Sequence, residues 1–301
     1  MRRAVVDLGS NTMRMEVYDE TDGNMKHIVS AKEVVGMIGY MEGGTLSEEG
    51  IVRVVDGLSA FRKTADAVGV EQICCFATAG LRAVNNADEV VRRAKEQLNM
   101  DIDIISGEEE ARLDFAGAYI PTDVKEGLVV DMGGGSTEIV RFSDDHIDNC
   151  ISLPYGSLYL YKRFVKKIIP RAGELKKIKE FVDRQLECVE WLKSVGGHIC
   201  LIGGTGRAIA RLHRDVHGRG TEPLQGYMFD ASDIAALLQW VLSHPKAGVR
   251  SILRVEPERV HTILPGMAAL SRLVGYAGVC TVSLSRSGVR EGYIKSTQID
   301  N

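Results

Sequence analysis

The sequence predicts an α/β protein made of two related domains, and three observations lead to this prediction. The chain has 301 residues, which is enough for two domains of ordinary size. Two stretches repeat one pattern, in which an apolar run ends in Asp and is followed by small residues and hydroxyls. Three candidate strands followed by alternating helices and strands also occur twice, an order typical of α/β proteins.

The repeated pattern indicates a phosphate-binding turn. Its copies are Asp7-Leu8-Gly9-Ser10-Asn11-Thr12 and Asp131-Met132-Gly133-Gly134-Gly135-Ser136-Thr137-Glu138. A turn of small residues after a strand exposes backbone N–H groups that can cradle a phosphate, and glycine lets the ligand approach closely. The Asp at the strand end can hold a metal ion or its water. We therefore expect two related domains that face each other across a phosphate site.

The first half of the chain follows the order expected of such a domain. Ser47, followed by Glu48 and Glu49, predicts the start of a long helix, because apolar residues recur at helical spacing from Ile51 onward. Asp22-Gly23-Asn24 is typical of a hairpin turn. The other expected elements are strands at 2–7, 12–18, 25–32, 71–77 and 102–105, and helices at 86–98 and 107–119.

The second half repeats this order after a short linker. Pro121 ends the preceding helix, so we place the domains at 1–120 and 127–301 with a linker at 121–126, and the last helix is free to pack back on the first domain. The expected strands are 127–132, 136–142, 145–152, 198–202 and 279–282. The expected helices are 157–167, 172–194, 205–216, 231–243, 265–276 and 288–297.

Composition excludes several classes of function. The chain is 45% hydrophobic and 26% charged, as in a soluble globular protein, and has no apolar run near the roughly 20 residues of a membrane helix. The N-terminus enters a strand pattern directly, so no signal peptide is expected. Six cysteines without CxxC or zinc spacing indicate reduced thiols in the cytoplasm. A net charge of −4 gives no general attraction to nucleic acid, so we expect a cytoplasmic protein that binds neither DNA nor membranes.

A third glycine cluster, Gly203-Gly204-Thr205-Gly206, follows a predicted strand and opens a helix whose N-terminus can bind an anion. A single glycine turn of this kind serves close packing of helix on strand about as often as it binds phosphate. Three clusters at strand ends, two of them with the same preceding Asp, favour phosphate binding.

An acidic triplet and one arginine complete the candidate catalytic residues. Glu108, Glu109 and Glu110 open a helix after a predicted strand, and complementarity to the helix dipole explains such a triplet when it is taken alone. Its place before the linker puts the helix at the mouth of the expected cleft, where a carboxylate can activate water. Arg82 follows another strand, and its guanidinium suits phosphate oxygens, although a surface arginine is an equally good interpretation.

Two further patterns have a plain interpretation and a functional one. Eight basic residues follow one another with little acid between them, which usually marks a solvated helix face but is also suited to a polyphosphate or nucleotide tail. They are Lys162, Arg163, Lys166, Lys167, Arg171, Lys176, Lys177 and Lys179. His213 and His217 have a spacing compatible with metal binding, but without a third ligand we favour surface histidines.

Together these motifs resemble the exopolyphosphatase/guanosine pentaphosphate phosphatase (Ppx/GppA) family, in its short form. The resemblance rests on the two phosphate motifs, the first continuing to Arg14, and on three further segments in family order over nearly the whole chain. These segments are an arginine motif at Thr78–Asn85, an acidic signature at Ile105–Ala111 and a C-terminal segment at Ser285–Gly292.

The resemblance implies a fold and an activity. The fold is that of two ribonuclease-H-like domains of the actin/Hsp70/sugar-kinase architecture around an active-site cleft. The activity is hydrolysis of phosphoanhydride bonds, which releases terminal phosphate from inorganic polyphosphate or guanosine pentaphosphate (pppGpp), the second of these in the stringent response. It also implies Mg²⁺ as cofactor, with Mn²⁺ as the alternative, and a homodimer.

The resemblance also assigns roles to residues of this sequence. Glu109 is implied as the carboxylate that activates water, with Glu108 and Glu110 left open. Arg82 is implied as a second catalytic residue, which contacts phosphate. Asp131 and Glu138 are implied as the magnesium carboxylates, with Asp7 as a helper. The implied phosphate contacts are Gly9, Ser10, Asn11, Thr12, Gly133, Gly134, Gly135, Ser136, Thr137, Gly204, Thr205 and Gly206.

The sequence departs from the family pattern in two places. Arg286 stands where the family often has Asp, and the chain stops at Asn301 without the helical region of long members, so we expect poor processivity or a preference for short substrates. Two other functions compete with hydrolysis. One is a non-catalytic phosphate or alarmone sensor, and the other is an ATP-using phosphotransferase of the same architecture, which needs an adenosine pocket and an acceptor site.

Overall fold

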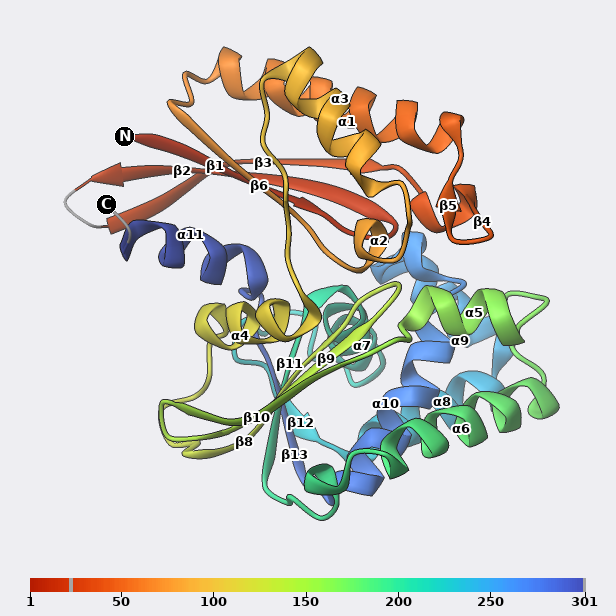
Figure 1. Ribbon diagram of the computed structural model, residues 1–301. Coiled ribbons are helices and arrows are strands. Elements are labelled where there is room, and N and C mark those ends of the chain that lie inside the picture. Colours follow the sequence, from red (N-terminus) through yellow and green to blue (C-terminus); the bar gives the residue numbers. More distant parts are fainter. Residues whose placement is uncertain (22–23, 300–301) are drawn as a thin grey trace. The chain divides into compact units, whose positions relative to one another are not determined.

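The computed structural model describes residues 1–21 and 24–299, and the chain divides into two compact units (Figure 1). The first unit comprises Met1–Glu110 together with the segment from Tyr293 onward, and the second comprises Ala111–Gly292. The chain passes from one unit to the other inside helix α4 (Gly107–Gly117) and returns inside helix α11 (Val289–Ile299). The linker predicted at 121–126 lies within the second unit, because Ala111 and the following turns pack on that unit's sheet.

The first unit is built on a five-stranded sheet of order β3-β2-β1-β6-β7. The strands are β1 (Arg2–Leu8), β2 (Thr12–Thr21), β3 (Asn24–Val34), β6 (Gln72–Ala77) and β7 (Asp103–Ile104). The first three are antiparallel, whereas β6 runs parallel to β1 and β7 parallel to β6. Pairing of β2 with β3 extends to Thr21 and Asn24, and the predicted turn residues Asp22 and Gly23 lie outside the described residues.

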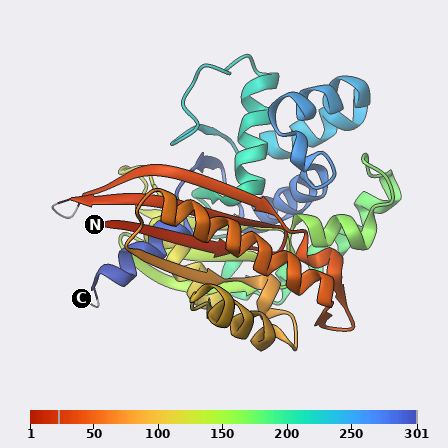
Figure 2. The ribbon, with the colours of Figure 1, turned by 90° about the horizontal axis from the view of Figure 1, so that it is seen from above.

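Helices α1 (Glu48–Ala67) and α3 (Ala87–Leu98) lie side by side on one face of this sheet (Figures 1 and 2). The Ser47 side chain accepts a hydrogen bond from the Gly50 N–H (3.3 Å), which confirms the predicted helix start. The buried stripe from Ile51 to Ala65 packs on the inner side chains of the sheet, such as Val6 and Met13. Each aliphatic side chain buried in this way contributes about 1.5–3 kcal/mol. The smaller elements of this unit are η1 (Met37–Tyr40), β4 (Met41–Glu42), β5 (Thr45–Leu46) and α2 (Ala79–Arg82).

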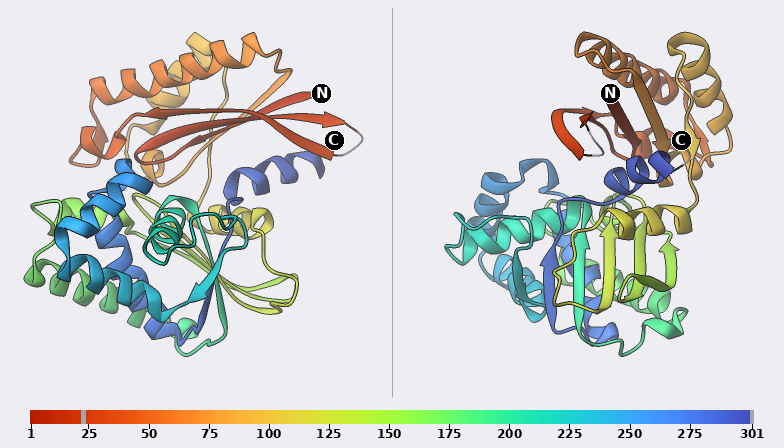
Figure 3. Two further views of the ribbon diagram at one scale, coloured as in Figure 1. Left: turned by 180° about the vertical axis from the view of Figure 1, so that it is seen from behind. Right: turned by 90° about the vertical axis from the view of Figure 1, so that its left-hand side faces the viewer.

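The second unit is built on a six-stranded sheet of order β10-β9-β8-β11-β13-β12, whose strands are seen side by side in the right-hand view of Figure 3. The strands are β8 (Glu126–Met132), β9 (Thr137–Ser143), β10 (His146–Leu153), β11 (His198–Ile202), β12 (Met228–Asp230) and β13 (Thr281–Leu284). The helices, besides parts of α4 and α11, are α5 (Ser157–Phe164), α6 (Ala172–Glu187), α7 (Gly203–Val216), α8 (Ser232–Ser243), α9 (Pro245–Val255) and α10 (Ile263–Ala277). Short 3₁₀ turns are η2 (Glu190–Leu192) and η3 (Pro257–Arg259).

Both sheets share one topology. In each, the first strand of an antiparallel three-stranded meander also pairs with a parallel strand that comes later in the chain. This duplicated arrangement confirms the predicted α/β fold of two ribonuclease-H-like domains. Among the described residues, no helix is both long and apolar enough to cross a bilayer.

Some predicted elements differ from the structure. Helix α5 ends at Phe164 and helix α6 at Glu187, whereas the sequence predicted 157–167 and 172–194. The apolar residues Val189 and Leu192 beyond α6 are buried, the first just before the 3₁₀ turn η2 and the second within it, so their spacing resembles that of a longer helix. Helix α9 was not predicted, although its first residue is Pro245 and proline is favoured at that position of a helix.

Candidate active site

The second unit holds its glycine loop on the start of helix α5. The Gly133 N–H donates to the Ser136 carbonyl (3.0 Å), which closes the turn between β8 and β9. The Gly133 carbonyl accepts from the Ser157 N–H (2.9 Å) and the Gly134 carbonyl from the Tyr159 N–H (2.9 Å). The Thr137 hydroxyl donates to the Tyr155 carbonyl (2.7 Å). These bonds fix the loop from the carbonyl side, which is how a backbone cradle for an anion is kept rigid.

Two carboxylates lie beside this loop. Asp131 and Glu138 are direct partners in the β8–β9 pair, so their side chains point to the same face of the sheet, about 5 Å apart at Cβ. Glu138 is buried and accepts a hydrogen bond from the Ser152 hydroxyl (2.8 Å). Two oxygen donors are thus held on adjacent strands at the loop.

The Asp131 carboxylate lies against the first residue of helix α7. Gly203 has φ +68°, and a Cβ at this position would lie 1.8 Å from Asp131 Oδ1. Any other residue would therefore both strain the backbone and displace the carboxylate. The sequence predicted a glycine turn here, and the structure adds that it makes room for Asp131.

The donor set of the second unit fits Mg²⁺. Carboxylate oxygens are the ligands that this ion prefers, and it is commonly bound by one or two carboxylates, with water and substrate phosphates filling the other positions. Within the part of the chain that the structure describes, no group of three or more His, Cys, Asp or Glu side chains forms a closed metal cage. Asp131 and Glu138 would hold the ion, and substrate oxygens would complete its coordination.

An arginine that the sequence analysis did not select lies at the third glycine cluster. A Cβ on Gly204 would lie 1.7 Å from Arg259 Nη2, so the guanidinium rests on the first turn of α7. Arg259 comes from η3, far along the chain from the cluster, and no local pattern marks it. In the same cluster Thr205 is buried with its hydroxyl 3.2 Å from that of Ser157, and a Cβ on Gly206 would lie 2.9 Å from the Leu201 Cβ. The later half of this cluster is thus also a packing device.

The first unit holds the equivalent loop in the same way. The Gly9 N–H donates to the Thr12 carbonyl (3.2 Å), the Asn11 carbonyl accepts from the Gly36 N–H (2.9 Å) and the Ser10 carbonyl accepts from the Ile38 N–H (3.2 Å). Ser10 is buried, and a Cβ on Gly80 would lie 3.0 Å from its Cα. The loop carbonyls are therefore tied to the segment that follows β3.

Asp7 has a different neighbour from Asp131. Its direct partner in the β1–β2 pair is Arg14, which occupies the place that Glu138 has in the second unit. An arginine opposite Asp7 disfavours a further cation at this place, whereas a second carboxylate favours one. The second unit is therefore the better candidate metal site.

The three acids at the start of α4 lie in different environments. The Glu109 N–H donates to the Ser106 hydroxyl (3.1 Å), and the side chains of Glu108 and Glu109 are exposed. Glu110 is buried, and its carboxylate accepts from the Arg82 guanidinium (3.1 Å). Arg82 Nη1 also donates to the Ile105 carbonyl (2.9 Å). Arg82 therefore fixes the start of α4, and the acids available to activate a water are Glu108 and Glu109.

The prediction of two surface histidines is wrong for His213. This side chain is 2% exposed, and its ring nitrogens lie 2.8 Å from the Tyr227 hydroxyl and 3.1 Å from Asp233 Oδ2. Burial lowers the pKa of His213. It is a polar core residue, whereas His217 is exposed, as predicted.

Comparison with known proteins places these features in one family. A model of the Ppx/GppA phosphatase family matches residues 16–299. The match covers the acidic triplet and the second glycine loop, and it begins after the first loop. The proposed roles of Asp7 and the first loop are therefore supported by the sequence pattern and the shared sheet topology, and not by this match.

Solved structures of similar length give the same result. One Ppx/GppA family member from Aquifex aeolicus is 26% identical, with a TM-score of 0.80, over 100% of this chain and 98% of that chain. A PPX-GPPA enzyme of Aquifex aeolicus is 28% identical, with a TM-score of 0.78, over 98% of this chain and 99% of that chain. An exopolyphosphatase from Cytophaga hutchinsonii is 22% identical, with a TM-score of 0.88, over 100% and 98% of the two chains, and shares the fold.

Proposed function

The chain belongs to the Ppx/GppA phosphatase family, and we propose that it removes terminal phosphate from inorganic polyphosphate or guanosine pentaphosphate in a Mg²⁺-dependent reaction. The observation that carries this proposal is the Asp131–Glu138 carboxylate pair beside a rigid glycine loop. A metal held by these oxygens and a phosphate held by the loop N–H groups would be neighbours.

Phosphoryl transfer asks for positioning and charge neutralisation more than for covalent chemistry. The loop residues Gly133, Gly134 and Gly135 supply backbone N–H groups, and Arg259 adds a cation at the start of α7. A bound Mg²⁺ would neutralise phosphate oxygens as the bridging bond breaks. In the first unit, Gly9, Ser10, Asn11 and Thr12 are proposed as further phosphate contacts.

We propose that the Glu109 carboxylate activates the attacking water. Its carboxylate is exposed at the start of α4, and its backbone is fixed by Ser106. Glu110 is paired with Arg82, so it serves to position the helix start. Arg82 is accordingly proposed as a positioning residue as well as a phosphate contact.

The test is phosphate release by the purified protein with Mg²⁺ from long polyphosphate, tripolyphosphate, guanosine pentaphosphate and ATP in parallel. The parent is compared with Glu109→Gln and with the matched neighbour Glu108→Gln. The proposal predicts release from polyphosphate or guanosine pentaphosphate, lowered about 10²–10⁴-fold by Glu109→Gln, as for a general base, and only slightly lowered by Glu108→Gln. Binding without release in every protein would instead indicate a sensor, and release from ATP alone would indicate an ATP-using enzyme.

A further inference from the structure

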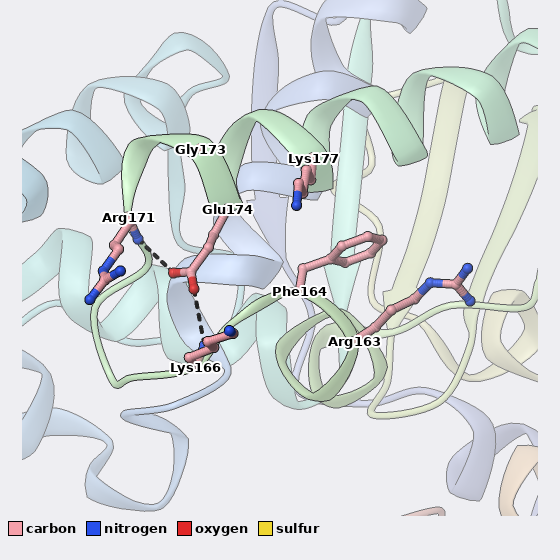
Figure 4. A pocket seen from close by; sticks show the side chains of 7 residues that line it. All are labelled: Arg163, Phe164, Lys166, Arg171, Gly173, Glu174 and Lys177. Atoms are coloured by element: carbon pink, nitrogen blue, oxygen red, sulfur yellow. Dashed lines mark hydrogen bonds between the residues drawn. The ribbon is translucent and has the colours of Figure 1, made fainter.

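A basic pocket lies in the second unit where α5 ends and α6 begins, and it encloses about 600 Å³ (Figure 4). Four cationic side chains, one carboxylate and one aromatic ring line it together with a glycine. These residues are Arg163, Phe164, Lys166, Arg171, Gly173, Glu174 and Lys177. They belong to the basic stretch for which the sequence alone left two interpretations open.

The pocket's carboxylate is already engaged. Glu174 Oε2 accepts from the Arg171 N–H (2.8 Å) and Oε1 from the Lys166 N–H (3.3 Å), as the dashed lines in Figure 4 show. Glu174 therefore closes the segment between the two helices and caps the start of α6. It accepts these bonds from backbone groups, so the four cationic side chains keep their charge for another ligand.

Among the residues that the structure describes, the four cationic side chains of the pocket have no carboxylate partner, unlike most arginines on the surface. Arg254 pairs with Asp215 (2.5 Å) and Arg272 with Asp183 (2.6 Å). In the described part of the chain, by contrast, no carboxylate lies within 4 Å of the cationic groups of the four pocket residues. Four cations beside the single carboxylate of Glu174 leave an excess of positive charge in the pocket, and a bound anion would relieve their repulsion.

One of the four cations is held in place by aromatic rings. Arg163 Nη1 donates to the Tyr159 hydroxyl (2.5 Å), and the guanidinium lies 5.4 Å from the centre of the Phe181 ring and 5.6 Å from that of Phe164. Such stacking fixes the plane of the guanidinium and leaves N–H groups on its edge for phosphate oxygens. The pocket thus has one rigid donor besides its flexible lysines.

The pocket is joined directly to the glycine loop. Helix α5 starts on the Gly133 and Gly134 carbonyls and ends at Phe164 in the pocket wall. Eight helical residues span about 12 Å. A ligand that occupies both places must therefore be a long anion with charge repeated along its length.

We infer that this pocket binds internal phosphate units of an inorganic polyphosphate chain whose terminal unit occupies the glycine loop. The inference rests on the proposed function and names the polymer as the substrate class. The charged lining offers N–H and ammonium donors, which suit the oxygens of repeating phosphate units. Its one carboxylate already accepts hydrogen bonds from the backbone, so it is not available to recognise the edge of a nucleotide base. With a net charge of −4 on the whole chain, a local patch is needed to attract such a polymer.

The test measures binding of long polyphosphate without turnover, in EDTA, by isothermal titration. The pocket variant is Lys166→Ala with Lys177→Ala. The control is Lys176→Ala with Lys179→Ala, which removes the same charge from α6 outside the pocket lining. A rescue variant carries Lys166→Arg with Lys177→Arg. We expect affinity to fall about tenfold in the pocket variant, as for two lost charge pairs, and to be retained in the control and rescue variants.

Kinetics with Mg²⁺ provide a second readout. The pocket variant should raise KM for long polyphosphate and leave kcat, and all constants for tripolyphosphate, unchanged. Equal weakening of binding in the pocket and control variants, or no weakening in either, would overturn the inference. If no protein releases phosphate but the binding pattern appears, the pocket stands and the proposed hydrolase function fails.

Discussion

The two glycine loops are closed by the same backbone hydrogen bond, but the residues opposite their strand-end aspartates carry opposite charges. In the first unit the Gly9 N–H closes the turn on the Thr12 carbonyl, and in the second the Gly133 N–H closes it on the Ser136 carbonyl. The strand-end Asp faces Arg14 in the first unit and Glu138 in the second. The same turn thus occurs twice, and the two copies differ in the charge of the residue across the strand pair.

The segments that hold the loops also differ. The carbonyls of the first loop bond to the chain after β3, and those of the second bond to the start of α5. The second arrangement links the loop to a helix that leads to the basic pocket. The proposed metal site and the proposed polyphosphate pocket therefore both belong to the second unit.

The largest expected effect distinguishes the two aspartates. Asp131→Asn should lower phosphate release about 10³-fold, because it removes one of the two carboxylates proposed to hold Mg²⁺, an ion that would stabilise transition-state charge. Asp7→Asn should lower it by about tenfold at most, since the residue opposite Asp7 is Arg14 and not a second carboxylate that could share a metal ion. Steady-state kinetics on both variants provide the check, and equal losses would remove the proposed difference between the loops.

A second prediction uses two glycines with the same backbone conformation. Gly203 and Gly218 both have φ +68°, but only a Cβ at Gly203 meets Asp131. Both Ala variants should lose about 1–2 kcal/mol of stability from backbone strain, measured by denaturant unfolding. Gly203→Ala should also lose about 10²-fold in phosphate release through displacement of the carboxylate. Comparable activity in the two variants would show that Gly203 does not position Asp131.

A third prediction converts the first loop toward the second. Arg14→Glu places two carboxylates opposite each other, which should destabilise the protein by about 1 kcal/mol without metal. Mg²⁺ should restore part of this loss by binding between them, so it should raise the melting temperature of Arg14→Glu by more than that of the parent and of Arg14→Gln, which keep only the site proposed at the second loop. The melting temperature with and without Mg²⁺ tests this, and an unchanged Arg14→Glu midpoint would argue against the importance of the cross-strand residue.

The smallest effect concerns pH. Burial lowers the pKa of His198 and His213, both in the second unit, from the usual value of 6.5. Because the unfolded chain then binds more protons, stability is present above about pH 6.5 and is lost as pH falls through the lower folded values. Hydrogen exchange should show the second unit losing protection first between about pH 7 and about pH 5. His198→Gln should reduce that loss, and an equal response of both units would contradict the assignment.

Much of the fold could be predicted because local signals agreed with the tertiary structure. The Ser47 cap and the apolar stripe of α1, and the glycine turns after β1 and β8, need only chemistry within a few residues. The alternation of strands and helices then fixed the α/β class.

The site was harder to predict because side-chain environment depends on distant residues. Glu108, Glu109 and Glu110 look alike in the sequence, and only packing reveals that Glu110 is buried on Arg82. Arg259 contacts Gly204 from the short turn η3, and no sequence motif predicts this contact. Likewise, the basic residues line one pocket because Glu174 bonds to the segment between α5 and α6, and the sequence does not reveal this contact.

The proposed roles of Glu138 and Glu109 are tested by phosphate release from polyphosphate as a function of Mg²⁺ concentration. The parent, Glu138→Gln and Glu109→Gln are compared, with Mg²⁺ binding titrated in parallel. We expect Glu138→Gln to require at least about tenfold more Mg²⁺, as for a lost ligand. We also expect Glu109→Gln to bind Mg²⁺ like the parent and to lose turnover about 10²–10⁴-fold. An unchanged Mg²⁺ requirement in Glu138→Gln, or full turnover in Glu109→Gln, would contradict the assignment of metal and water to these two carboxylates.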